Sequence, residues 1–293
     1  MASHGYYRKL QRYGYLFIFP TIALFAVFLI YSMLNSFQLS FFQWSLLDQK
    51  VFVGLRNFAR LLRDGRFWNS YLITFHFSLI SVAFISFSSF WLALALTSPL
   101  LKARNLLQSM IFLPVVLMEV AIAVVWRFMY QTTGVLSVLF TRVLGLKIAW
   151  LDSVEFAPYA MILVYFWRRT GFYMVMFIAG LLDIPRVYYE AATIDGAGFW
   201  SRLWHITLPQ LKNTLILVVV SATIFSFGTF AVQFIMTGGG PAQSTEVLAL
   251  LIYKQAFEYT RFGYAAAISV VYFLTLLLFA VVQLNIFKSQ AEG

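Results

Sequence analysis

Six long apolar stretches constrain this chain more than any other feature of its sequence. A helix needs about 20 consecutive apolar residues to cross the hydrocarbon core of a bilayer, and each stretch is about that long. The sequence therefore predicts an all-α integral membrane protein whose 293 residues form a single transmembrane domain. The predicted membrane spans are residues 15–34, 71–96, 110–130, 157–182, 211–235 and 264–287.

The composition excludes several other classes of protein. Hydrophobic residues make up 61% of the chain and charged residues only 11%, whereas about a quarter of the residues in a soluble domain are charged. There is no cysteine and the three histidines are scattered, so neither disulfides nor a metal site are expected. The net charge of +10 fits basic loops beside the anionic surface of a lipid bilayer. No separate basic segment points to nucleic-acid binding.

One polar segment, residues 189–209, lies between the fourth and fifth predicted spans. Two glycines separate a helix-favouring run from a second one that follows it. We therefore expect a helix, a glycine turn and a second helix at the membrane surface. Ala191 and Ala192 would give the first helix a flat face for another backbone, with the charges of Glu190 and Asp195 beside it.

The same segment carries a motif: E-A-A, three residues, glycine, nine residues and I-x-L-P. This motif resembles the signature loop of permease subunits of bacterial binding-protein-dependent ABC importers for carbohydrates, such as the maltose and glycerol-3-phosphate permeases. The resemblance implies six transmembrane helices of the type I importer kind, with residues 183–210 as a cytoplasmic coupling loop that docks into an ATPase. The residues expected at that contact are Glu190, Ala191, Ala192, Asp195, Gly196, Ile206, Leu208 and Pro209.

The resemblance also implies the partners of this chain. It would form half of the translocation pathway of an ATP-driven carbohydrate importer. The other components would be a second homologous permease, two ATPase subunits and a periplasmic or extracellular solute-binding protein. The ATPase subunits would bind ATP and magnesium and carry out hydrolysis. This chain is therefore expected to be a permease without a cofactor, and not an enzyme.

A second loop, between the fifth and sixth spans, contains the sequence T-G-G-G-P from Thr237 onward. It is not a phosphate-binding loop, because the pattern G-x-x-x-x-G-K-[ST] needs a lysine that is absent here. It resembles the extracytoplasmic T-x-G-G-P loop of sugar permeases, on the side where that family meets its binding protein. The residues expected to face the binding protein are Gly239, Gly240 and Pro241.

Polar and aromatic residues within the spans are candidates for a substrate pathway, because ionisable groups at membrane depth are costly and face a protein interior or a water-filled cavity. Counted from Glu190, several of them match positions that line the sugar site of maltose permeases, although an arginine stands at position 169 in place of a small residue. The substrate would be a sugar, an oligosaccharide or an anionic sugar such as a uronate or a sugar or glycerol phosphate. The candidates are Tyr165, Arg168, Arg169, Phe172, Phe225, Ser226 and Thr229.

The same residues also allow a purely structural interpretation. Arg168 and Arg169 point about 100° apart on a helix, so one can face the pathway while the other pairs with Glu119 or reaches the membrane surface. Glu119 is expected to be an ion-pair partner and not a proton carrier. Ser226 and Thr229 can bond to carbonyl groups of their own helix.

The orientation in the membrane follows from the family resemblance. The predicted loops on the two sides carry equal numbers of Lys and Arg, although the basic residues before the first span favour a cytoplasmic N-terminus. The resemblance implies the bacterial cytoplasmic membrane, with both termini in the cytoplasm. An ion-driven secondary sugar transporter is the alternative, but six spans without an inverted repeat and a complete docking motif argue against it.

Overall fold

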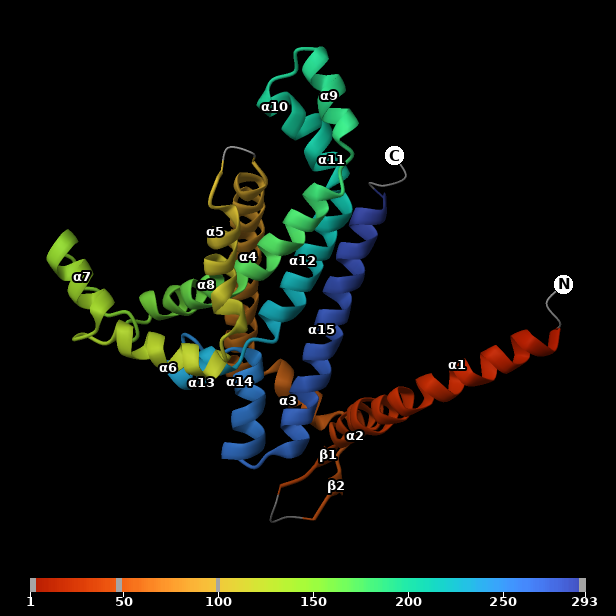
Figure 1. Cartoon of the computed structure of the whole chain (residues 1–293). Coiled ribbons are helices and arrows are strands. Elements are labelled where there is room, and N and C mark those ends of the chain that lie inside the picture. Colours follow the sequence, from red (N-terminus) through yellow and green to blue (C-terminus); the bar gives the residue numbers. More distant parts are fainter. Residues whose placement is uncertain (1–3, 46–48, 99–100, 290–293) are drawn as a thin grey trace. The chain divides into compact units, whose positions relative to one another are not determined.

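The computed structural model consists mostly of helices (Figure 1). It describes residues 4–45, 49–98 and 101–289. Within this part of the chain, six helical segments are long and apolar enough to cross a membrane, which agrees with the predicted all-α membrane fold. They are Tyr13–Leu39, Gly65–Thr97, Glu119–Leu144, Phe156–Leu182, Lys212–Met236 and Phe262–Ile286.

Five of these segments overlap the predicted spans along almost their whole length, but the third prediction was wrong in its extent. The predicted range 110–130 covers the second half of α5 (Arg104–Val116) and all of α6 (Glu119–Tyr130), which are two separate helices. Leu117 and Met118 lie between the two helices with extended backbones, at ψ 145° and 131°. The local sequence contains signals that the prediction did not use, because Pro114 lies in the last turn of α5 and the acidic Glu119 is the first residue of α6.

The chain divides into two compact units, and unit 1 comprises residues 1–64 and 252–273. Its first helix continues from α1 through a π-helical segment to α2. A two-stranded antiparallel hairpin follows, in which Phe42 pairs with Phe52, and this small sheet is an addition to the all-α prediction. The elements that belong wholly or partly to unit 1 are α1 (His4–Leu24), η1 (Phe25–Ile30), α2 (Tyr31–Leu39), β1 (Phe42–Gln43), β2 (Val51–Phe52), α3 (Arg56–Leu62), α14 (Leu248–Tyr253), η3 (Lys254–Glu258) and α15 (Phe262–Ser289).

Unit 2 comprises residues 65–251 and 274–293 and holds all the predicted site residues. The short helices between α8 and α12 form a separate projection at one end of these two helices (Figure 1). Besides α5, α6 and parts of α14 and α15, the elements of unit 2 are α4 (Gly65–Thr97), α7 (Val135–Leu144), α8 (Phe156–Leu182), α9 (Arg186–Ile194), α10 (Phe199–Arg202), η2 (Leu203–Thr207), α11 (Leu208–Gln210), α12 (Lys212–Phe227) and α13 (Ala231–Met236).

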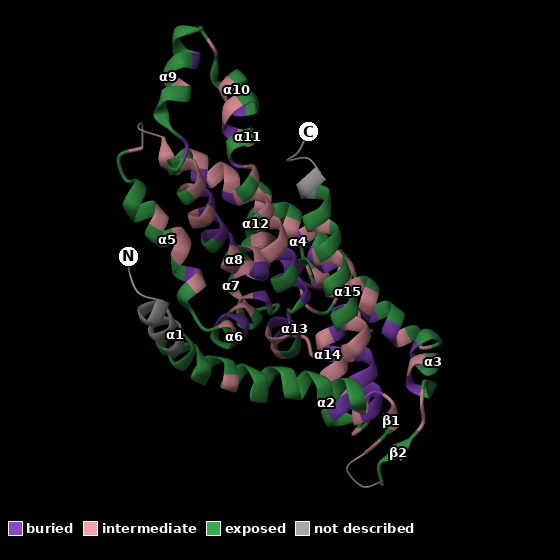
Figure 2. Cartoon of the chain, turned by 90° about the vertical axis from the view of Figure 1, so that its right-hand side faces the viewer, coloured by how far each residue is buried: buried purple, intermediate pink, exposed green. Residues whose placement is uncertain are grey.

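The core of unit 2 forms where α4 packs against α8 and α12. A stripe of small polar residues runs along the buried face of α4, which lets neighbouring helices approach closely and bond across the contact. Ser89 donates a hydrogen bond of 2.9 Å to the backbone oxygen of Thr170 on α8, and the hydroxyls of Ser78 and Ser226 lie 2.5 Å apart. Figure 2 shows the buried residues of these helices in purple.

The first membrane helix contrasts with this core. No residue is buried in the most apolar 18-residue window of Tyr13–Leu39, and Figure 2 shows the described part of α1 exposed along almost its whole length. An apolar helix of this length has no stable place in water, so lipid or protein must cover it.

Candidate functional site

The segment with the E-A-A motif folds as expected, into two helical arms around a glycine turn. Gly196 ends α9 with φ +74°, in the left-handed region that favours glycine. Its N–H donates to the oxygen of Thr193 at 3.1 Å, and the N–H of Ala197 donates to the oxygen of Ala192 at 2.8 Å. These two bonds form a Schellman motif, which satisfies the last carbonyl groups of the helix. The glycine of the E-A-A motif at position 196 is therefore the residue that makes the turn.

Side chains that the sequence interpretation missed hold the two arms together. The hydroxyls of Tyr189 on α9 and Thr207 on η2 lie 3.0 Å apart. Arg202 donates to the hydroxyl of Thr193 at 3.4 Å, and that hydroxyl donates to the oxygen of Tyr189 at 2.7 Å. We call residues 186–210 the coupling hairpin. Two of these three bonds, Tyr189 to Thr207 and Arg202 to Thr193, join the two arms, so the periodicity of a single helix could not reveal them.

The coupling hairpin exposes a different face from the one expected. Glu190, Ala191 and Asp195 are exposed, but Ala192 is only 9% exposed and packs inside the hairpin. Neighbouring residues point about 100° apart on a helix, so the two alanines cannot share one open face. Large apolar side chains cover the outside instead, and they are Val187, Tyr188, Ile194, Phe199, Trp200 and Trp204.

The remaining motif residues form the base of the hairpin. Ile206 and Leu208 are half-buried, and Pro209 is exposed in α11 just before the fifth span. Ile184 and Leu211 are buried at the two ends where the hairpin joins α8 and α12. The base is therefore anchored in unit 2, while the outer face is open to a partner.

The two membrane arginines have separate surroundings. Arg168 Nη1 lies 3.2 Å from Glu119 Oε2, so the ion pair expected for one of them forms at Arg168. The guanidinium carbon of Arg169 lies 5.7 Å from the Tyr165 ring and 5.1 Å from the Phe225 ring. The structure thus brings three predicted pathway residues together, from α8 and α12.

This cluster contains polar atoms that other described residues do not satisfy. Tyr165 is 2% exposed, and within the described part of the chain neither its hydroxyl nor Nε of Arg169 has a hydrogen-bond partner. Buried polar atoms are normally paired, so these atoms are suited to a polar ligand or water. Phe172 lies further along α8, with its ring 5.2 Å from that of Tyr173.

Ser226 and Thr229 are both buried, and neither hydroxyl is free. Ser226 contacts Ser78 and also donates to the backbone oxygen of Thr223 on its own helix at 3.0 Å. Thr229 donates to Oε1 of Gln233 at 3.0 Å. The predicted span 211–235 is interrupted here, because α12 ends at Phe227 and α13 begins at Ala231.

The loop with the G-G-P sequence is less exposed than expected. Gly239 is buried and the next two residues are half-buried, so the exposed tip consists of Ala242 and Gln243. Arg66 of α4 holds the loop through a bidentate ion pair with Glu246, at 2.7 and 2.8 Å. The two residues are far apart in the sequence, which explains why no local pattern revealed this pair.

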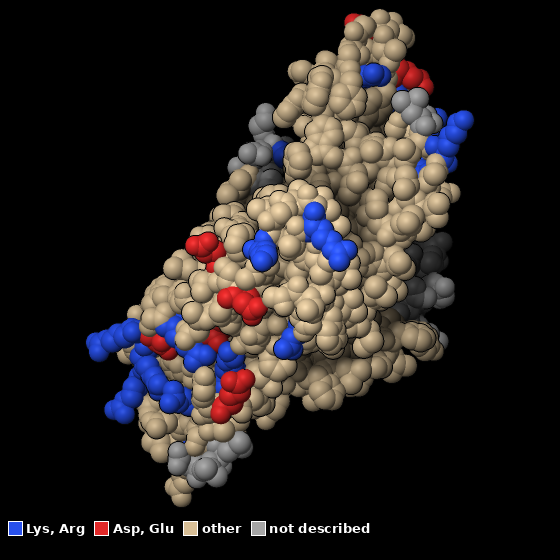
Figure 3. Space-filling view, turned by 90° about the vertical axis from the view of Figure 1, so that its left-hand side faces the viewer, with Lys and Arg blue, Asp and Glu red and all other residues tan. Residues whose placement is uncertain are grey.

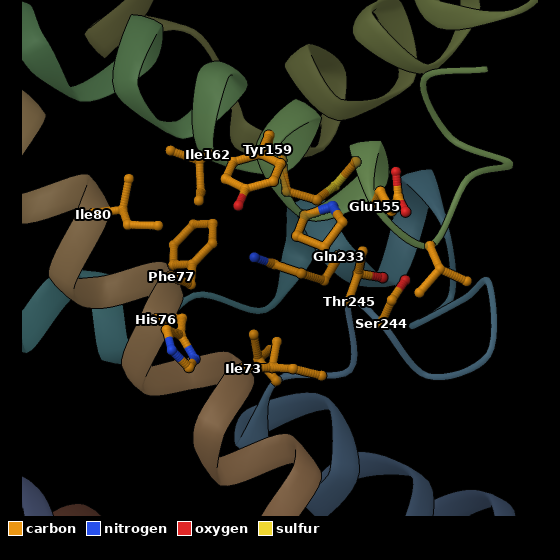
Figure 4. A pocket seen from close by; sticks show the side chains of 14 residues that line it. Ile73, His76, Phe77, Ile80, Glu155, Tyr159, Ile162, Gln233, Ser244 and Thr245 are labelled. Atoms are coloured by element: carbon orange, nitrogen blue, oxygen red, sulfur yellow. The ribbon is translucent and has the colours of Figure 1, made fainter. Parts of the chain in front are cut away.

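A cavity of about 410 Å³ lies between α4, the start of α8 and this loop (Figure 4). Figure 4 shows the amide nitrogen of Gln233 and the hydroxyl of Tyr159 pointing into it, beside the Phe77 ring. Gln233 is 1% exposed and its Nε2 has no hydrogen-bond partner among the described residues. The Phe77 ring lies 5.3 Å from that of Tyr165, so the cavity adjoins the predicted pathway. Aromatic rings with polar groups beside them can hold a hydroxyl-bearing ring.

Comparisons with known proteins agree with these observations. The family model described as "binding-protein-dependent transport system inner membrane component" matches residues 76–289. The trehalose/maltose transport system permease protein MalF of Thermococcus litoralis is 33% identical over 98% of this chain and 97% of its own. The lactose transport system permease protein LacF of Rhizobium radiobacter is 35% identical over 90% and 91%.

A solved structure has a similar fold. It is a bacterial alginate ABC transporter in complex with an alginate pentasaccharide-bound periplasmic protein. One of its chains is 23% identical and superposes with a TM-score of 0.82 over 94% of this chain and 93% of that chain. At 23% identity, this similarity shows only that the two chains share a fold.

Proposed function

Because this chain belongs to the family of binding-protein-dependent transport system inner membrane components, we propose that it forms half of the translocation pathway of an ATP-driven carbohydrate importer. It is a multi-pass membrane protein, and its relatives are permease subunits and not enzymes. A second, homologous permease would complete the pathway. The ion-driven alternative has no support in the family or in the relatives.

The observation that carries this proposal is the exposed apolar face of the coupling hairpin. Ile194 is 87% exposed and Trp204 is 63% exposed, on a projection that also carries the exposed Glu190. Exposed apolar patches rimmed by charges mark protein contacts. We propose that this face docks into an ATPase subunit, which binds ATP and magnesium. Closure of two such subunits would then move the two hairpins of a permease pair and rock their membrane helices.

The substrate class follows from the relatives and from Arg169. The relatives named above transport trehalose and maltose, or lactose, according to their names, and the structural neighbour imports alginate, an acidic polysaccharide. Tyr165 and Phe225 offer rings for the apolar faces of a sugar, and Arg169 offers a charge for a carboxylate or phosphate group. We propose a sugar or oligosaccharide, with an anionic sugar favoured.

The proposed orientation places both termini and the coupling hairpin in the cytoplasm, with the membrane being the bacterial inner membrane. The hairpin joins α8 to α12, whereas the loop after α13 follows the other end of the fifth span. That loop would therefore meet a periplasmic or extracellular solute-binding protein. Its exposed residues are Ala242 and Gln243, which directly follow the predicted Gly239, Gly240 and Pro241, and we propose that this exposed tip makes the contact.

Reversal of one charge on the hairpin tests the proposed coupling. Glu190→Lys places a positive charge on the exposed docking face, and we expect ATP-driven uptake into proteoliposomes to fall at least about tenfold, because misplaced charges at an interface are costly. The helix content and the melting temperature should stay unchanged, since Glu190 is exposed.

Glu258→Lys is the matched control, because Glu258 is also exposed but lies in η3, outside the hairpin. Its uptake should equal that of the wild type. Unchanged ATPase stimulation by the folded Glu190→Lys variant would contradict the assignment of the hairpin.

A further inference from the structure

A cavity of about 350 Å³ in unit 1 is lined by three arginines. Arg56 and Arg60 lie one helical turn apart on α3, and Arg261 directly precedes α15. The rings of Trp44 and Tyr259 form further parts of the wall. All of these residues belong to unit 1, so this cavity is distinct from the predicted substrate pathway in unit 2. Figure 3 shows Lys and Arg side chains gathered on one part of the molecular surface, with fewer Asp and Glu side chains among them.

Close contacts fix the elements that carry the three arginines. Asn57 of α3 donates a hydrogen bond of 2.9 Å to the backbone oxygen of Phe42 in β1. Gly263 brings the start of α15 against the same strand, where an added Cβ would lie 1.8 Å from the Phe42 oxygen. The hydroxyl of Tyr264 donates to Asp64 at 2.5 Å, which ties α15 to the end of α3. The three arginines therefore lie on or beside helices that contacts with β1 and with each other hold in place.

The charge of this cavity is only partly compensated. Arg60 lies 4.8 Å from the centre of the Tyr264 ring and Arg261 lies 6.0 Å from that of Tyr259. Such cation–π contacts are not hydrogen bonds, so they do not use the N–H donors that a guanidinium can offer to an acceptor. Among the residues that the structure describes, no carboxylate forms an ion pair with any of the three arginines. The segments 40–64 and 254–261 together contain six basic and three acidic residues.

The cavity lies at the level where two membrane spans end. The first span ends at Leu39, shortly before Trp44, and the sixth begins at Phe262, immediately after Arg261. The rings of Trp44 and Phe262 are 5.0 Å apart. Tryptophan and tyrosine are enriched at the headgroup level of a bilayer. In the proposed orientation this is the outer side, where loops normally carry few Lys and Arg, so a group of three around one cavity calls for an anionic partner.

We propose that this cavity binds the phosphate group of an anionic phospholipid. Guanidinium groups match phosphate oxygens in bidentate geometry, and three of them suit a headgroup with a net negative charge. A zwitterionic headgroup would bring its own cation toward the arginines and bind less well. The cavity residues all belong to unit 1 and lie near the ends of two membrane spans. The proposed lipid site therefore does not depend on which sugar is transported.

Native mass spectrometry of the protein, purified in mild detergent with the subunits that accompany it, tests this proposal. Phosphatidylglycerol and phosphatidylcholine are added in turn, and we expect preferential retention of phosphatidylglycerol. The triple variant Arg56→Gln, Arg60→Gln and Arg261→Gln should lose that preference, with affinity falling about fivefold for each arginine. Arg63→Gln is the matched control, because Arg63 caps α3 but does not line the cavity.

Each outcome of this experiment decides the proposal. Loss of phosphatidylglycerol in the triple variant, with retention in the Arg63→Gln variant and an unchanged helix content in both, supports it. Displacement of the bound phosphatidylglycerol by millimolar inorganic phosphate also supports it, because it shows that the site recognises the phosphate group. Equal retention of both lipids, or of phosphatidylglycerol by the wild type and the triple variant, overturns it. So does a triple variant that keeps the lipid and loses only its response to a solute-binding protein.

Discussion

The guanidinium of Arg169 stands between two aromatic rings, in a cluster that also contains the buried hydroxyl of Tyr165. An arginine stays charged at any physiological pH, so this side chain needs an anion or several polar groups near it. The neighbouring Arg168 already has Glu119 as its partner. Of the two, Arg169 is therefore the one placed to select a ligand by charge.

Substitution of Arg169 tests this division of roles. We expect Arg169→Ala to lower uptake of an anionic oligosaccharide at least about tenfold more than uptake of a neutral one, because a hydrogen bond to a charged group is lost. Arg168→Ala should reduce both uptakes alike, since it disrupts an ion pair and not a ligand contact. Uptake assays in proteoliposomes with the two sugars measure the ratio, and an equal loss of both in the Arg169→Ala variant would contradict the prediction.

At the scale of the element, the coupling hairpin depends on one backbone conformation. Gly196 has φ +74°, whereas Gly198 has φ −70° and ψ 174°, which any residue can adopt. An added Cβ would meet no atom within 4 Å at either position. Backbone strain is therefore the only expected difference between alanine substitutions at the two glycines.

The pair of substitutions gives a matched test. Gly196→Ala should weaken the Schellman motif by about 1 kcal/mol, the cost of the left-handed conformation for alanine. Hydrogen exchange of the amides at positions 196 and 197 should then be about fivefold faster. Gly198→Ala should leave these exchange rates unchanged. Equal rates in both variants would mean that the turn does not depend on the glycine at position 196.

Most elements could be predicted from the sequence, because apolar runs and glycine turns act locally. The fourth span was predicted as 157–182 and is Phe156–Leu182, and the turn at Gly196 has the expected form. Contacts between distant segments could not be predicted. Arg66 meets Glu246 across 180 positions, and Ala192 is buried although its neighbour Ala191 is exposed. The stripe of small polar residues on α4 was visible in the sequence at helical spacing.

At the scale of the whole molecule, two surfaces require partners. One is the apolar outer face of the coupling hairpin, and the other is the first membrane helix, which the rest of unit 1 does not bury. Each chain carries one E-A-A motif, so a complete importer with two ATPase subunits needs two permeases. We therefore expect this chain to occur as part of a larger complex.

Isolation of the complex tests that expectation. After purification in mild detergent, mass spectrometry should detect an ATPase and a second six-span permease with this chain. Ile194→Asp places a charge on the most exposed apolar residue of the hairpin, so it should release the ATPase and leave the second permease bound. Recovery of the intact chain alone or only as a homo-oligomer would contradict the proposed assembly.

The interruption between α12 and α13 also bears on how the protein is made. Residues 228–230 leave the regular helix within the fifth span, where the N–H of Thr229 donates to the oxygen of Ser226 three residues back, so the regular ladder of main-chain groups is interrupted there. Hydrocarbon cannot satisfy such groups, and water or neighbouring helices must do so. The fifth span is therefore expected to be unstable in the bilayer as an isolated helix. Its stable integration depends on α4 and α8, which leave the ribosome before it.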